Sequence, residues 1–171
     1  MPLDLLALRI AHIIAGAAWV GGAFAMILLV SKTARLRGTD GDVFMSTLLT
    51  EGKAARYFEI AALTTVVAGS LLYWRASSGL QLAWITSPTG IAFTIGALAA
   101  FVSLAWGGLM VGPAGKRAKA IEDEVAGSGG LPSAAQRAEL DSIKARLNRF
   151  AVADLILLGT AVATMATARY L

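Results

Sequence analysis

The feature that most constrains this chain is the near absence of charge from long apolar stretches. Four stretches hold at most one Asp, Glu, Lys, Arg or His each: residues 10–30, 60–74, 76–115 and 150–168. The two exceptions are His12 and Asp154. Soluble helices carry charges along one face, whereas a helix that crosses a bilayer needs about 20 largely apolar residues. The sequence therefore predicts an all-α integral membrane protein with a bundle of four transmembrane helices.

The whole chain, residues 1–171, is predicted to be one membrane domain. Its expected transmembrane helices cover about 3–30, 57–74, 91–111 and 150–170. The intervening segment, about 113–149, carries apolar side chains at helical spacing on both sides of a Gly-rich break. Ser133 and Gln136 after this break can form a capping box. We therefore expect helices three and four to extend into the cytoplasm as a helical hairpin.

The basic residues indicate an orientation. Two long loops, before helix two and before helix four, hold twelve of the 15 Lys and Arg residues. The positive-inside rule assigns both loops to the cytoplasm and both termini to the outside of a bacterial-type inner membrane. The net charge of +4 follows helix ends, which favours contact with anionic lipid over nucleic acid.

The N-terminal segment bears on whether a signal peptide is present, and the absence of cysteine limits the kinds of metal site. Asp4 precedes the first basic residue, and the apolar run up to Val30 is longer than that of a signal peptide, so we expect an uncleaved helix. The chain has no cysteine, which excludes disulfides and thiolate metal sites.

His12, the only histidine, lies in the first apolar run. Arg9, His12, Gly16 and Trp19 follow at steps of three, four and three, so they share one helix face. Imidazole within a membrane is a candidate ligand for heme iron or copper. The alternative is a neutral imidazole that hydrogen-bonds a neighbouring helix. Gly16 can likewise make room for a porphyrin or let two helices pack closely.

Helix rise suggests which residues lie at the same depth. With about 1.5 Å per residue, His12 and Met165 lie at similar depths, toward the outer side. Met165 shares a helix face with Asp154 and can complete a His/Met pair on heme iron, or it can simply pack in the core.

A second polar layer lies toward the inner side, where Asp154 and Glu59 form either an ion path or polar contacts between helices. The partners considered for Asp154 are Arg56, Asn148 and Trp106. In addition, Met26 and Met110 share a depth near the inner face, and with His12 and Met165 they suggest a copper path.

No catalytic residue is predicted. A Ser/His/Asp site would need an Asp at the depth of His12, and the apolar segments offer none. No phosphate-binding loop or metalloprotease motif is present. The sequence leaves open whether the protein is an enzyme.

The segment from Leu8 to Ile14, followed by Trp19-Val20-Gly21-Gly22, resembles the first helix of the CopD-like superfamily. This group includes copper-resistance CopD domains, HemJ-type protoporphyrinogen oxidases and four-helix proteins without a known role. The segment from Trp106 to Pro113 and the ending from Met165 to Tyr170 look most like the last of these.

The resemblance implies a four-helix bundle in which His12 matches the histidine that ligates heme in HemJ-type proteins. The chain lacks the Pro-Arg-rich stretch and the intramembrane lysine expected of HemJ, which argues against protoporphyrinogen oxidation. It also lacks the extra helices of a full CopD transporter.

Three functions follow as expectations. The first is a small membrane protein that binds heme b through His12, with Arg9, Gly16, Trp19 and Met165 around the site, for electron transfer or heme handling. The second is a non-catalytic accessory subunit that packs in a larger bioenergetic complex, or a homo-oligomer. The third is copper transport.

Overall fold

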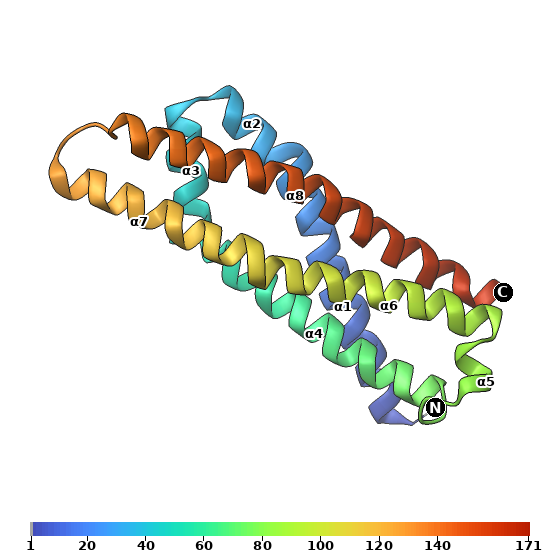
Figure 1. The fold of residues 1–171 in the computed structure, drawn as a ribbon. Coiled ribbons are helices and arrows are strands. Elements are labelled where there is room, and N and C mark those ends of the chain that lie inside the picture. The colour runs from blue at the N-terminus through green and yellow to red at the C-terminus, as the bar shows by residue number, and fades with distance from the viewer. Residues whose placement is uncertain (1) are drawn as a thin grey trace.

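The part of the chain that the structure describes, residues 2–171 of a computed structural model, consists of helices and connecting turns, without strands (Figure 1). Four helices in this part are long and apolar enough to cross a membrane. The elements in chain order are α1 (Leu3–Ala25), η1 (Met26–Val30), α2 (Ser31–Leu36), α3 (Thr39–Leu49), α4 (Ala54–Ala76), α5 (Leu82–Ile85), α6 (Pro88–Trp106), η2 (Gly107–Val111), α7 (Gly112–Ser128), α8 (Ala134–Thr167) and η3 (Ala168–Tyr170).

Two of the spanning helices each contain a π-helical turn. In the first, α1 runs through η1 into α2 as one helix from Leu3 to Leu36. In the third, α6 runs through η2 into α7, from Pro88 to Ser128. A π-turn adds a residue to the turn, disturbs the regular hydrogen bonding and commonly occurs at functional places. Both π-turns fall at the end of the apolar stretch, where the basic segments begin.

Local sequence signals explain how the helices begin and end. Ser87 caps α6, because its Oγ accepts a hydrogen bond from the Gly90 amide at 3.1 Å, and Pro88 occupies the first turn. The capping box predicted at Ser133 and Gln136 is confirmed at the start of α8. Gly129, with a φ of +63°, ends α7 in the left-handed conformation that glycine adopts readily.

The bundle consists of two helix pairs. α1 packs mainly on α4, and α6 packs mainly on α8, while contacts between the pairs are fewer. The main core lies between Trp19 of α1, Val66 of α4 and Leu158 of α8, with small alanines filling the closest approaches. Both chain ends and α5 lie at one end of the bundle, and α3 and the α7–α8 turn lie at the other (Figure 1).

Beyond the apolar part, α7 lies against the first half of α8 and forms a second small core. Ala114, Ile121 and Ile143 are buried there, with Ile121 fully inaccessible. Arg117 donates two hydrogen bonds to the Glu139 carboxylate, at 2.7 and 2.9 Å. This charge-assisted contact lowers the pKa of Glu139 below its ordinary value.

The outer surface of the bundle is apolar. Large side chains such as Ile13, Leu63, Leu98 and Ile156 are exposed along the four long helices. In a water-soluble protein such a surface would be a strong liability, whereas in a bilayer it is the surface that contacts lipid chains.

Candidate functional site

His12 lies on α1 against α4, at a place where α4 has small residues. Its Nδ1 is 2.8 Å from the backbone carbonyl oxygen of Thr65. A carbonyl only accepts hydrogen bonds, so Nδ1 carries the proton and is the donor. Gly69 leaves room for the ring, since a Cβ at this position would lie 2.8 Å from His12 Cε1. The imidazole is therefore oriented by the neighbouring helix, and in the neutral ring Nε2 keeps its lone pair.

Gly16 and Trp19, which share the face of His12, pack within the chain. A Cβ at Gly16 would meet the Thr65 methyl group at 3.5 Å, which is an ordinary packing distance. Trp19 is buried in the main core. Gly16 therefore lies in the contact between α1 and α4, at a position where a Cβ would also fit. Arg9 is exposed one turn nearer the N-terminus.

Met165 lies against a different helix from His12. A Cβ added to Gly96 on α6 would lie 2.8 Å from Met165 Cγ and 2.7 Å from Thr164 Oγ1. Met165 thus packs where α8 contacts α6, while the His12 ring packs on α4. The contacts that place the two predicted iron ligands therefore lie on different helices.

Asp154, the only acidic residue in the fourth apolar stretch, accepts a hydrogen bond from Ser103 Oγ at 2.5 Å. Ser103 is buried on α6, so this bond joins α6 to α8. It was not among the partners expected for Asp154. Asn148 instead accepts a hydrogen bond from Arg35, and Trp106 Nε1 is buried without a hydrogen-bond partner in residues 2–171.

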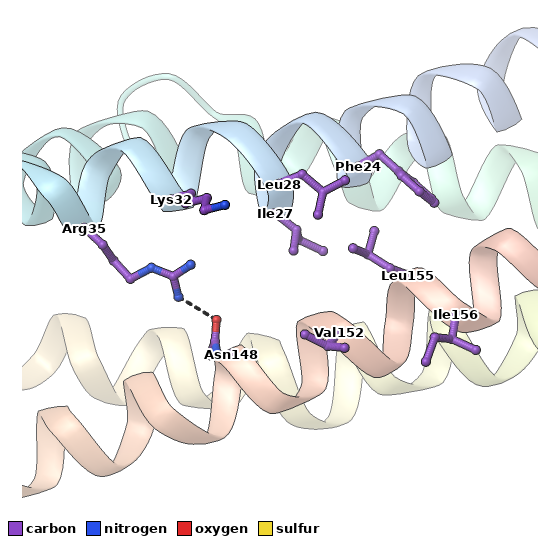
Figure 2. Close-up of a pocket in the computed structure, with 9 residues that line it drawn as sticks. All are labelled: Phe24, Ile27, Leu28, Lys32, Arg35, Asn148, Val152, Leu155 and Ile156. Atoms are coloured by element: carbon purple, nitrogen blue, oxygen red, sulfur yellow. Dashed lines mark hydrogen bonds between the residues drawn. The ribbon is translucent and has the colours of Figure 1, made fainter.

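Two grooves lie on the bundle surface. The larger, about 440 Å³, lies between the segment of α1, η1 and α2 from Phe24 to Arg35 and the middle of α8, from Asn148 to Ile156 (Figure 2). The smaller, about 330 Å³, runs between α1 and α4 and is lined by Leu8, Leu63, Thr64, Val67 and Ala68. Leu8 is one helical turn before His12, and Ala68 precedes Gly69, so the smaller groove adjoins the imidazole without including it.

A heme site needs an axial donor atom and space for the porphyrin. The donor fits, because one imidazole with Nδ1 bonded to a carbonyl is a common arrangement for a metal-binding histidine. Gly16 faces Thr65 of α4, whose methyl group would lie 3.5 Å from an added Cβ, so a porphyrin beside Gly16 would have to share that space with Thr65. The part of the chain that the structure describes contains no cluster of three or more His, Cys, Asp or Glu side chains that could hold a bare metal ion.

In comparisons with known proteins, no family model, no curated protein and no solved structure matches this chain.

Proposed function

We propose that this protein is a small multi-pass membrane protein that binds heme b through Nε2 of His12. The observation that supports the proposal is the 2.8 Å contact between His12 Nδ1 and the Thr65 carbonyl, which favours the tautomer with the proton on Nδ1 and an unprotonated Nε2. We favour heme over a bare copper ion because heme needs only one or two protein donors. A bound heme would supply one-electron chemistry, in electron transfer or in heme handling.

The remaining roles concern the surroundings of the ligand. Arg9, one turn from His12, is the candidate for contact with a propionate, because guanidinium pairs well with carboxylates. The smaller groove beside His12 offers apolar walls on one side. Met165 stays a prediction as a second iron ligand, and it would have to leave its packing against Gly96 to act as one. The other possibilities are an open sixth position and a second His12 from another copy.

The test separates a ligand from a structural histidine. His12→Ala should abolish the Soret absorbance of protein purified with heme. His12→Asn retains a side-chain donor for the Thr65 carbonyl, so it should keep the fold while losing heme. Added imidazole should restore the absorbance in His12→Gly. Full heme content in His12→Asn would remove His12 from the site, and a wild-type protein that takes up no heme would end the proposal.

Orientation and the α7–α8 projection form part of the same proposal. We place the projection in the cytoplasm as a helical hairpin and both termini outside, because the basic residues gather in the two long loops. Reporter fusions at Gly129 and Leu171 should report opposite compartments. A cytoplasmic signal at Leu171 would contradict this orientation.

A second candidate function is that of a subunit packed in a larger complex or homo-oligomer. The observation behind it is a ridge of small residues on α1, Ala17, Gly21 and Ala25, all exposed; a Cβ at Gly21 would meet nothing within 4 Å. Such ridges commonly let transmembrane helices approach closely. Gly21→Leu should release the partner during purification while heme content stays the same. A variant that co-purifies as the wild type does would count against this role.

A further inference from the structure

The larger groove is apolar at one end and polar at the other, which suits an amphiphilic ligand. Its walls are apolar at one end, where Phe24, Ile27 and Leu28 face Val152, Leu155 and Ile156. Its other end holds Lys32, Arg35 and Asn148. Figure 2 shows this division, with Arg35 reaching across to Asn148 and the apolar side chains further along both helices.

The polar end of the groove has a net positive charge. Arg35 Nη1 donates to the neutral Asn148 side-chain oxygen at 2.6 Å, and neither Arg35 nor Lys32 forms an ion pair with any residue in 2–171. None of the residues that line the groove is acidic. Asp154, the nearest acidic residue along α8, is bonded to Ser103 on α6. Two cations at the mouth of an apolar groove therefore favour a ligand with an anionic head.

The position of the groove in the bundle limits where the ligand comes from. Phe24 and Arg35 are eleven residues apart, which corresponds to roughly 16 Å along the helix axis. The apolar end lies within the first and fourth apolar stretches, and the cations begin where the first stretch ends. The groove thus runs from the hydrocarbon region to the level of lipid headgroups on the side of the long loops.

A π-helical turn forms part of one wall of this groove. Ile27 and Leu28 belong to the π-turn η1, and α1 contacts α8 only sparsely compared with α4. A widened turn in place of a regular one shifts the side chains that follow it, which is a recurrent device at binding sites.

We infer that this groove binds one anionic phospholipid from the leaflet next to the long loops. Its phosphate would contact Lys32 and Arg35, and one acyl chain would lie between η1 and α8. The inference does not depend on heme binding by His12, which lies against α4.

The test uses the full-length protein in nanodiscs or mild detergent, with native mass spectrometry to count bound lipids. Phosphatidylglycerol should remain bound in preference to phosphatidylcholine. Lys32→Gln with Arg35→Gln should weaken its binding roughly 30-fold, the change expected when two basic contacts to an anionic lipid are removed. The matched control, Lys116→Gln with Arg146→Gln, makes the same change in charge outside the groove and should bind as the wild type does.

A second pair of variants tests the apolar part. Val152→Trp fills the groove and should expel the lipid. Val162→Trp, at another exposed valine of α8, should not. Circular dichroism of all variants checks that the helices remain intact.

Several outcomes would overturn the inference. One is equal retention of phosphatidylglycerol and phosphatidylcholine. Another is a loss of phosphatidylglycerol binding in Lys116→Gln with Arg146→Gln that is as large as the loss in Lys32→Gln with Arg35→Gln. Retention of inorganic phosphate alone, supplied at the same concentration as the lipid, would assign Lys32 and Arg35 to the binding of a free anion. A dimer that Val152→Trp dissociates, with no lipid bound, would assign the groove to a second copy of the chain.

Discussion

Gly96 lies where α6 packs tightly against α8, and replacing it with alanine should push the two helices apart. The new Cβ would lie 2.7 Å from Thr164 Oγ1 and 2.8 Å from Met165 Cγ. Neither atom can move cheaply. The Thr164 hydroxyl is held by a 2.8 Å hydrogen bond to the Thr160 carbonyl, and Cγ of Met165 is close to the backbone rather than at the flexible end of its side chain.

The cost follows from comparison with a matched glycine. Overpacking of a well-filled core costs about 1–3 kcal/mol. Alanine gains up to about 1 kcal/mol over glycine in a helix, which obscures the packing cost in a single variant. Gly159→Ala on α8 gains the same helix propensity but adds no steric overlap, because a Cβ at this position meets nothing within 4 Å. The difference between the two variants is therefore the packing cost, about 2 kcal/mol, or roughly 4–8 °C in Tm for a chain of this length.

The measurement is thermal unfolding of both variants in the same detergent, followed by circular dichroism at the helix band. The Tm of Gly96→Ala should be lower than that of Gly159→Ala by roughly 4–8 °C. Adding Met165→Ala to Gly96→Ala should recover part of the loss, since it removes one of the two clashing side chains. Equal melting temperatures for the two glycine variants would show that Met165 does not pack on α6, and would reopen its role as an iron ligand.

Four further outcomes are expected. The ¹⁵N spectrum of the only imidazole should show a proton on Nδ1 in heme-free protein, and Gly69→Ala should alter that spectrum by displacing the His12 ring from Thr65. Ser103→Ala should lower stability by about 1–3 kcal/mol in detergent unfolding, because Asp154 loses its donor, whereas Ser142→Ala at an exposed helical position should not. Ile121→Ala should cost about 2–5 kcal/mol and expose the α7–α8 turn to protease. The pKa of Glu139 is lowered in the fold, so its stabilising contact with Arg117 is complete above the ordinary carboxyl pKa and is lost as the pH falls through the lowered value. The protection of α7 amides from exchange, taken relative to the intrinsic exchange rate at each pH, should therefore fall in acid, and Arg117→Gln should remove that pH dependence.

The long helices were predictable because their cause is local. An uncharged apolar run of sufficient length has few alternatives to a helix in a membrane, and the start of α8 has its own sequence signature in Ser133 and Gln136. The segment before α4 was predicted less accurately. A long basic loop was expected before helix two, but the structure has a helix there, α3. It ends at Leu49, and Lys53 adopts a φ of +53° between α3 and α4.

The partners of the polar residues were harder to predict, because pairing depends on how helices rotate against one another. The acceptor for His12 is a backbone carbonyl, and any residue has one, so nothing in the sequence identifies Thr65. Depth along the helix placed His12 and Met165 at one level but could not reveal that they face different helices. Ser103 had a usable signal: it continues the spacing of Ala92, Gly96 and Ala99 along one face of α6.

The division into two helix pairs bears on how the chain is made. Each pair joins helices that are neighbours in sequence, α1 with α4 and α6 with α8, and the short segment around α5 connects them. The N-terminal pair can therefore complete its own packing, including the seat of His12 on Thr65 and Gly69, while the ribosome is still synthesising the second pair. Two features form only after α8 has been synthesised: the packing of Leu158 into the main core, and the groove beside η1. Biogenesis would then proceed in two stages, and a lipid seated between the pairs would be acquired at the second.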